Sequence, residues 1–390
     1  MEYKQASRIN KQTDNVHRLN EHFNYGIHET QKITDRYFAP SSPSFLPYIP
    51  MILSGSDINS IAVCASCIRA GGIFGLPTET VYGLGANADD RGAVARIFAA
   101  KGRPADHPLI VHVADASAVA HFASDVPDFA KKLMASFWPG ALTLILHRRD
   151  GVATAAAGGN NTIGLRCPRH PVAQNLLLSL ISSGHPVVWG IAAPSANLFG
   201  RVSPTTAQHV QDEFGGELLI LDGGPCSVGI ESTIMDCTRG QPVLLRPGSI
   251  TPDQVQAVCG LKVLLNQELP TLTGQAPKAS GTLESHYAPR AAVVLLDAVA
   301  LRQALDDWPP TRPAVAVWSH TQVDVPPTMH HLPMPLDAAS AAQQLFAVLR
   351  HFDALGVSQI LTETVPDTAE WDGVRDRLQR AACKSSVATW

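Results

Sequence analysis

The segment from residue 71 to residue 112 carries the densest set of side chains that could do chemistry. A short apolar run at 73–76 is followed by a turn rich in hydroxyl groups and glycines, with the sequence PTETVYGLG. An amphipathic helix is predicted next, and Lys101 and Arg103 stand at its end around a glycine. Cations and hydroxyls placed where a strand meets loops are typical of a site that binds an anion.

Similar groups recur at the ends of other apolar runs. The set comprises Arg166, Ser195, Asn197, Glu231, Ser232 and Arg246, and His112 lies inside a further apolar strand. Because ligands of open α/β sheets bind at strand ends, we expect these side chains to face one crevice. Each has an alternative explanation, since surface cations are usually solvated and strand histidines are often buried structural residues. Their recurrence favours a nucleotide or phosphate site.

Other chemistries find little support in the sequence. Ser195 lacks the Gly-x-Ser-x-Gly pattern of a hydrolase nucleophile. Neither His-Glu-x-x-His nor a Gly-x-x-x-x-Gly-Lys-Ser/Thr loop is present. Cys64 and Cys67 form a lone C-x-x-C pair at helical spacing, so we predict helix residues and not a zinc or redox site.

Composition limits the class of protein. The chain has 390 residues, 45% of them hydrophobic, which is ample for globular cores. A net charge of −4 argues against a protein coated in nucleic acid, so any RNA contact would need a local patch. Seven scattered cysteines, an odd number, fit a reducing cytoplasm. The apolar runs are too short to span a bilayer, so no membrane contact is expected.

The chain divides into four segments. Residues 1–50 are polar and predict a disordered extension, with a mis-assigned start before Met51 as the alternative. In residues 51–260 predicted strands and helices alternate. Glycines and prolines interrupt residues 261–290, as is typical of a linker. Residues 291–390 predict a smaller Rossmann-like α/β domain. Ser203-Pro204 and Thr251-Pro252 each predict a helix start.

The spacing of apolar runs predicts an α/β fold whose sheet is mixed and not purely parallel. Predicted strands of the larger segment are 73–76, 109–113, 142–146, 163–165, 187–192, 218–221, 233–235 and 243–245. In the C-terminal segment the predicted strands are 292–296, 315–318 and 359–361, with helices near 298–306, 338–355 and 371–382.

Taken together, these motifs resemble the threonylcarbamoyl-AMP synthase family of the YrdC/TsaC type. The similar strings, in chain order, are PTETVYGLGA, KGRPADHPLIVH, WPGALTLIL, IGLRCPRHP, AAPSAN, SPT, GIESTI and LLRPGSIT. The string SGTLESHYAP and the unit after it are similar to the long form of the family, which carries an extra C-terminal domain. The family fold is a twisted, mixed open sheet around a basic cavity.

The resemblance implies a reaction in which L-threonine, bicarbonate (or CO2) and ATP give L-threonylcarbamoyladenylate and pyrophosphate. ATP is then a substrate, and Mg2+ is expected on its phosphates. The product would supply the threonylcarbamoyl group of tRNA N6-threonylcarbamoyladenosine through a downstream transfer machinery, with a transient tRNA contact. A cytoplasmic enzyme is implied.

The resemblance also implies roles for individual residues. Arg166 would clamp the threonine carboxylate, because guanidinium and carboxylate pair bidentately. Lys101 and Arg103 are implied as catalytic residues, and no protein ligand to a metal is implied. The threonine pocket would also contain Thr78, Thr80, His112 and Ser232. Residues implied to face ATP are Arg103, His107, Thr162, Ser195, Asn197, Ser203, Arg246 and Tyr287. Tyr287, in the linker, could gate the site against water.

Two other hypotheses stay open at this point. The first is an RNA-binding module that uses the basic concave face without catalysis, although the acidic overall charge counts against it. The second is a related carbamoyl-transfer enzyme that acts on another acceptor. Fused acylphosphatase or zinc-finger segments would favour that hypothesis, and the sequence shows neither.

Overall fold

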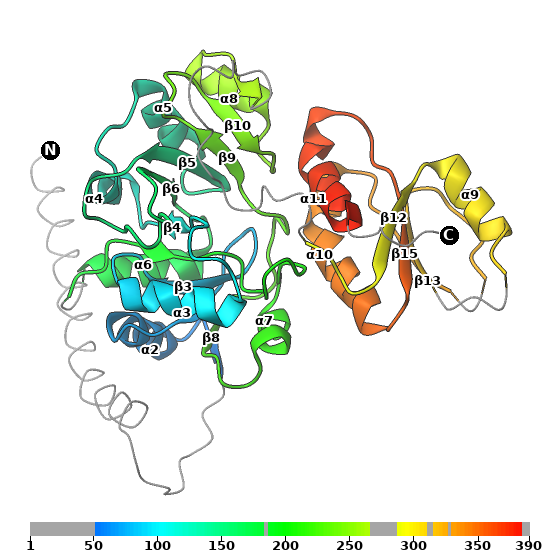
Figure 1. Cartoon of the computed structure of the whole chain (residues 1–390), viewed down its shortest axis with the longest axis horizontal. Coiled ribbons are helices and arrows are strands. Elements are labelled where there is room, and N and C mark those ends of the chain that lie inside the picture. Colours follow the sequence, from blue (N-terminus) through cyan, green and yellow to red (C-terminus); the bar gives the residue numbers. More distant parts are fainter. Residues whose placement is uncertain (1–50, 183–185, 266–286, 310–314, 327–328, 384–390) are drawn as a thin grey trace, which may run out of the picture.

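The computed structural model describes residues 51–182, 186–265, 287–309, 315–326 and 329–383, which form two sheets. Figure 1 shows a larger unit in blue to green beside a smaller one in yellow to red. We call these the larger unit (residues 51–265) and the C-terminal unit (residues 287–383). The predicted extension at 1–50 and most of the predicted linker, 266–286, lie outside the described residues.

The larger unit is built on a mixed sheet of eleven strands in the order β1-β8-β2-β3-β7-β4-β6-β5-β9-β10-β11. Parallel pairs such as β4–β6 and β5–β9 alternate with antiparallel pairs such as β5–β6 and β4–β7. The mixed sheet confirms the predicted fold class. Its strands are β1 (Ile52–Ser54), β2 (Phe74–Leu76), β3 (Gly83–Asn87), β4 (Ile110–His112), β5 (Leu142–His147), β6 (Thr162–Arg166), β7 (Ile191–Ala192), β8 (Ile220–Asp222), β9 (Thr233–Asp236), β10 (Val243–Arg246) and β11 (Leu264–Leu265).

Strand β3 was not predicted, because its glycines have the composition of a turn. It pairs with β2 on one side and β7 on the other. A Cβ atom at Gly85 would lie 3.0 Å from the side chains of both Ile191 and Phe74. The glycine therefore permits a close approach within the sheet, which is one of the roles that glycine has inside strands.

Helices cover the sheet of the larger unit. Two of them begin at a side-chain cap: Asp57 accepts from the backbone N–H of Asn59, and Asp90 from those of Gly92 and Ala93. The helices are α2 (Ile58–Arg69), α3 (Arg91–Lys101), α4 (Val119–Phe122), α5 (Asp128–Phe137), α6 (Pro171–Ser182), α7 (Ala207–Phe214) and α8 (Pro252–Cys259), with a 3-10 turn, η1, at Ala116–Ala118.

One of the two predicted helix starts is confirmed and the other is wrong. Thr251 and Gln254 form a capping box at the start of α8, as predicted. Helix α7 begins instead after Thr206, whose side chain accepts from the backbone N–H of His209. Ser203 is not a cap because its hydroxyl donates to the carboxylate of Glu231.

The lone C-x-x-C pair lies in α2, as predicted. Cys64 is fully buried in a core cluster with Ile61 and Ile68. Burial raises the pKa of the Cys64 thiol and raises that of Cys67 to about 11, so both stay protonated at neutral pH. Within the described ranges no cluster of three metal-ligating side chains was found. No described helix is both long enough and apolar enough to cross a membrane.

The C-terminal unit contains a four-stranded parallel sheet in the order β12-β15-β13-β14. The predicted helices and three of the strands are confirmed to within about two residues, while β14 was not predicted. Its elements are β12 (Ala292–Leu296), α9 (Ala298–Asp306), β13 (Val315–Ser319), β14 (His330–Pro333), α10 (Ala338–Ala354), β15 (Gln359–Glu363), a 3-10 turn, η3, at Ala369–Trp371, and α11 (Asp372–Ala382).

Helices α10 and α11 face the larger unit, with α9 on the far side (Figure 1). A single buried cluster joins Val202 and Ile230 of the larger unit to the core beneath these helices. A Cβ atom at Gly373 in α11 would lie 2.7 Å from the side chain of Ile230 and 3.2 Å from the Cα of Gly248. The two units are therefore in close contact, and α11 lies directly against the turn after β10.

Candidate active site

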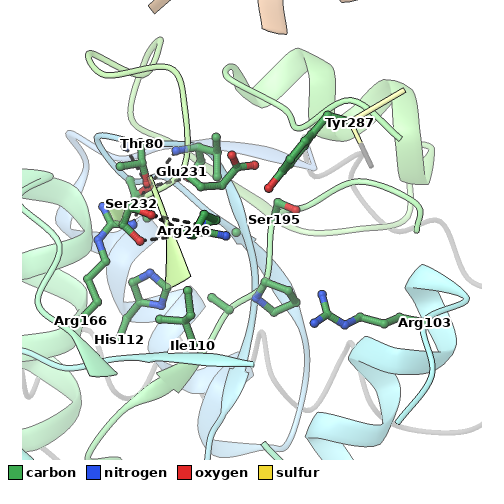
Figure 2. Close-up of a pocket in the computed structure, with 15 residues that line it drawn as sticks. Thr80, Arg103, Ile110, His112, Arg166, Ser195, Glu231, Ser232, Arg246 and Tyr287 are labelled. Carbon is green, nitrogen blue, oxygen red and sulfur yellow. Dashed lines mark hydrogen bonds between the residues drawn. The ribbon is translucent and has the colours of Figure 1, made fainter. Parts of the chain in front are cut away.

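A pocket opens among the strand ends of the larger unit, with charged and polar side chains in its walls. Its walls come from the β2–β3 turn, the ends of β4, β6 and β10, and the segments after β7 and before β9 (Figure 2). The lining residues are Thr78, Thr80, Val81, Gly83, Arg103, Ile110, His112, Arg166, Ala193, Pro194, Ser195, Glu231, Ser232, Arg246 and Tyr287. The expected convergence of strand-end side chains on one crevice is thus observed.

Arg166, the last residue of β6, is held by three groups. Its Nε donates to the carbonyl oxygen of Gly140 at 3.1 Å, and Nη1 donates to Oγ1 of Thr80 at 2.7 Å. Nη2 lies 2.7 Å from Oε1 of Glu79 in an ion pair with both side chains buried. A guanidinium has five N–H groups, so these contacts fix its orientation and leave donors for a ligand in the pocket.

Glu79 lies behind Arg166 and is not among the lining residues. Burial alone would raise the pKa of its carboxyl group, but the charge and hydrogen bond of Arg166 outweigh burial and hold the pKa below its usual value. The carboxylate is therefore ionised at neutral pH and offsets the cost of burying Arg166.

The hydroxyl-rich turn before β3 is ordered by its own side chains. Oγ1 of Thr78 donates to the carbonyl oxygen of Val81 at 2.6 Å and lies 2.9 Å from Oγ1 of Thr80. The backbone N–H groups of Thr80 and Val81 both donate back to Oγ1 of Thr78. This network places the Thr80 hydroxyl against Arg166 at the pocket wall.

His112 ends β4 directly beside Arg166 in the parallel β4–β6 register. The imidazole is buried, and no hydrogen-bond partner for its Nδ1 was found among the described residues. Burial, reinforced by the nearby charge of Arg166, lowers the pKa of His112 to about 3. The ring is therefore neutral and presents a nitrogen that a ligand can engage.

Ser232 and Arg246 form a second wall. Nε and Nη2 of Arg246 donate to the carbonyl oxygen of Ser232 at 3.1 and 3.0 Å. The Ser232 hydroxyl lies 2.8 Å from Oγ1 of Thr143 on β5 and 3.3 Å from Nη2 of Arg246. The guanidinium is buried next to the segment that opens β9, and this places a second cation on the pocket surface.

The opposite wall carries Arg103 and Ser195 (Figure 2). Nη2 of Arg103 donates to the carbonyl oxygen of Pro108 at 3.0 Å, and burial lowers the pKa of Arg103 to about 10. Arg103 therefore remains charged at neutral pH. Three arginines and one carboxylate, that of Glu231, line the pocket, which suits a ligand with several negative charges.

Lys101 lies under this wall and is not among the lining residues. Its Nζ donates to the backbone carbonyl oxygens of Ser195 and Asn197. Burial, with the nearby charge of Arg103, lowers the pKa of Lys101 well below its usual value. In this geometry the Lys101 side chain fixes the loop after β7.

Four other residues that were predicted to face ATP are not in the pocket lining. Asn197 donates to the carbonyl oxygens of Leu198 and Arg201, and the ring of His107 packs against that of Phe199 at 5.7 Å. Ser203 reaches the pocket only through Glu231. Thr162 starts β6, so it is about 13 Å along the strand from Arg166.

Glu79 and Arg377 were not predicted as site residues, and Glu231 was predicted to face the crevice but was given no role. Glu79 and Glu231 stand within the motif strings PTETVYGLGA and GIESTI, so the motifs contained the signal but no role had been deduced. Arg377 of α11 contacts Glu231 from the C-terminal unit. It lies in a helix rich in charged residues, and its sequence context does not separate it from solvated neighbours.

Family comparisons agree with this geometry. Residues 66–248 match a family described as Telomere recombination (Sua5_yciO_yrdC), and residues 250–383 match the family described as Threonylcarbamoyl-AMP synthase, C-terminal domain. The threonylcarbamoyl-AMP synthase of Pyrococcus abyssi is 37% identical over 83% of this chain and 94% of its own length. That of Bacillus subtilis is 38% identical over 83% of this chain and 92% of its own.

A solved structure extends the similarity to three dimensions. The crystal structure of Pyrococcus abyssi Sua5 complexed with L-threonine has a TM-score of 0.76 and 36% identity, and the match covers 86% of this chain and 98% of that one. These findings favour the enzyme over the RNA-binding module. The chain belongs to the threonylcarbamoyl-AMP synthase family.

Proposed function

We propose that this protein makes L-threonylcarbamoyladenylate from L-threonine, bicarbonate (or CO2) and ATP, and releases pyrophosphate. The observation that carries the proposal is the pocket itself, on which buried Arg166, neutral His112 and two further arginines converge. The family relationship and the threonine complex of the similar Sua5 structure support the choice of substrates.

The chemistry requires no covalent nucleophile from the protein. The threonine amine adds to CO2 to give a carbamate and loses a proton. A carbamate oxygen then attacks the α-phosphorus of ATP, and the bond from that phosphorus to the bridging oxygen of pyrophosphate breaks. The protein must hold two anions close together and neutralise charge on the leaving group, which is achieved by positioning and electrostatics.

The threonine half of the pocket is proposed to lie around Arg166. The guanidinium would bind the threonine carboxylate, with its plane already fixed by Glu79, Thr80 and Gly140. Thr78 would act by orienting Thr80. Neutral His112 would offer Nδ1 to the amino acid without adding positive charge, and Ser232 would contribute its hydroxyl.

The ATP half is proposed to lie between Arg103, Ser195 and Arg246. Arg103 and Arg246 would neutralise the phosphates, and Arg103 is the proposed catalytic cation as pyrophosphate leaves. Lys101 is proposed to support catalysis by holding the Ser195–Asn197 loop. Binding of ATP by His107, Thr162, Asn197 and Ser203 stays a prediction.

Mg2+ is proposed to bind through the phosphate oxygens of ATP, which is how this ion is usually held in nucleotide enzymes. Glu231, the carboxylate that lines the pocket, is engaged by Ser203 and Arg377. The bound ion would supply additional charge neutralisation at the phosphates.

Tyr287 is proposed to be the gate of the site. Its hydroxyl points into the pocket (Figure 2), and the side chain is almost fully buried. Burial, with the nearby charge of Glu231, raises the pKa of Tyr287 to about 12, so the hydroxyl is neutral. A neutral aromatic cover would exclude water from a product that hydrolyses readily.

We also propose that the chain divides into domains at about residues 260 and 290. The protein is proposed to be cytoplasmic and to pass its product to the machinery that modifies tRNA.

The catalytic proposal is tested by pyrophosphate release from ATP, with Mg2+ and bicarbonate. Release should depend on L-threonine and be lost when serine or valine replaces it. Equal release with all three amino acids, or no release at all, would contradict the proposed function.

A further inference from the structure

The side chain of Arg377 in α11 joins two segments that form the pocket. Nε donates to Oε2 of Glu231 at 3.0 Å, and Nη2 donates to the backbone carbonyl oxygen of the same residue at 3.3 Å. Nη1 donates to the carbonyl oxygen of Pro247 at 2.8 Å. The guanidinium is 0% exposed, although it belongs to a different unit from the residues it binds. It therefore fixes the entrance to β9 and the turn after β10 relative to each other.

Arg377 also supports Tyr287. Its guanidinium carbon lies 5.4 Å from the centroid of the Tyr287 ring, within the range of a cation–π contact. Tyr287 has a backbone φ of 61°, which is uncommon for a residue other than glycine. The packing around the ring, to which Phe346 contributes at 5.4 Å, offsets the cost of this conformation.

Both oxygens of the Glu231 carboxylate are engaged, since Oε1 accepts from the Ser203 hydroxyl at 2.5 Å and Oε2 from Arg377. The charged and titratable groups that face Glu231 are Arg377 with its partner Asp376 on α11, Arg246 on β10, Lys101 at the end of α3, and Tyr287. Burial alone would raise the pKa of Glu231, but Arg377 and Arg246 outweigh burial and hold it below its usual value.

We propose that Arg377 is a positioning residue of the active site, which holds the Glu231 carboxylate and the Tyr287 ring in place from the C-terminal unit. The C-terminal unit then completes the pocket wall and is required for full activity. The inference rests on the proposed function, because it concerns the same reaction. The residue added to the active site, Arg377, lies about 130 positions after Arg246, the last strand-end cation of the larger unit.

Arg377→Met is the variant that separates this role from simple packing, because it keeps much of the side-chain volume and removes the charge. We expect kcat/KM for ATP in threonine-dependent pyrophosphate release to fall about thirtyfold or more, the lower end for truncating a buried charge pair. Without Arg377 the carboxyl group of Glu231 protonates more easily. The acid limb of the pH profile should therefore move to higher pH.

A double variant makes the test specific. In Arg377→Met/Glu231→Gln the amide cannot ionise, so the shift of the acid limb should disappear, while kcat/KM should stay low because the carboxylate that Arg377 holds is gone. Arg377→Lys retains the charge but cannot make all three contacts, and we expect a lowered kcat/KM with the acid limb close to that of the wild type. Arg375→Met is the matched control, because Arg375 binds Asp367, Asp372 and Pro366 within the C-terminal unit.

The outcomes are distinct. Threonine-dependent release by the wild type and by Arg375→Met tests the proposed function by itself. If these two are active and Arg377→Met matches them in both kcat/KM and pH profile, the positioning role is refuted. A loss in Arg377→Met with an unmoved acid limb also refutes it, and so does an acid limb that stays shifted in Arg377→Met/Glu231→Gln. If Arg377→Met does not fold, Arg377→Lys decides, since wild-type kcat/KM in that variant would overturn the proposal.

Discussion

The neutral, buried His112 predicts a measurable dependence of stability on pH. Its pKa is about 3 in the folded protein against an ordinary value of 6.5. Since the folded state disfavours the imidazolium, the unfolded chain binds a proton at this residue as the pH falls below 6.5, while the folded chain does not. Proton binding at His112 therefore leaves the free energy of unfolding unchanged well above pH 6.5, and it lowers this free energy progressively as the pH falls from 6.5 toward 3.

The magnitude follows from the linkage relation. Between pH 7.5 and pH 5.0, protonation of the unfolded chain at His112 lowers the free energy of unfolding by about 2 kcal/mol, at about 1.36 kcal/mol for each pH unit below 6.5. Other histidines whose pKa burial lowers, such as His170 and His209, add to the total, so the wild type alone cannot isolate this residue.

The assay compares urea unfolding of the wild type and of His112→Gln at both pH values, followed by tryptophan fluorescence. We expect the wild type to lose about 2 kcal/mol more than the variant between pH 7.5 and 5.0. His121, which is partly exposed and paired with Asp89, provides the control variant His121→Gln, which should retain the pH dependence of the wild type. Equal losses in wild type and His112→Gln would show that His112 is not a buried neutral imidazole.

Two further predictions concern the proposed substrates. Arg166→Ala should raise the KM for threonine about thirtyfold or more, because the proposed buried charge pair with the threonine carboxylate loses one partner. The KM for ATP should change much less. An unchanged threonine KM in steady-state kinetics would remove Arg166 from the threonine pocket. Tyr287→Ala should leave the protein folded by circular dichroism but shorten the lifetime of the adenylate product, measured by chromatography; identical turnover and product lifetime would exclude the gate.

Part of the pocket lining was visible in the sequence, while some of the strands that carry it were not. Cations and hydroxyls at strand ends are visible in the sequence, since Arg166 and Arg246 each close an apolar run. Strands β6 and β10 run in the same direction with β5 and β9 between them, so these ends lie at one edge of the sheet. Strand β3 escaped prediction because Gly83 and Gly85 are used for close approach, which has the same composition as a turn.

Long-range pairing limited the prediction of individual contacts. The Ser203 hydroxyl, expected as a helix cap, is used by Glu231, 28 residues later, and Glu231 is in turn bound by Arg377, 146 residues later. The first contact depends on packing within the larger unit and the second on packing between the two units, and local patterns carry no information about either. Lys101 illustrates the same limit, because its position at a helix end gives no sign that two carbonyl groups will accept hydrogen bonds from its Nζ.

The central claim is that one pocket joins threonine, bicarbonate and AMP in a single product. The most direct measurement incubates the purified protein with ATP, Mg2+, L-threonine and 13C-labelled bicarbonate, and identifies the adenylate by mass spectrometry. We expect a product that contains AMP, threonine and one labelled carbon, formed in equal amount to pyrophosphate. Pyrophosphate release with no labelled adenylate, or an adenylate of threonine without the labelled carbon, would contradict the proposed reaction.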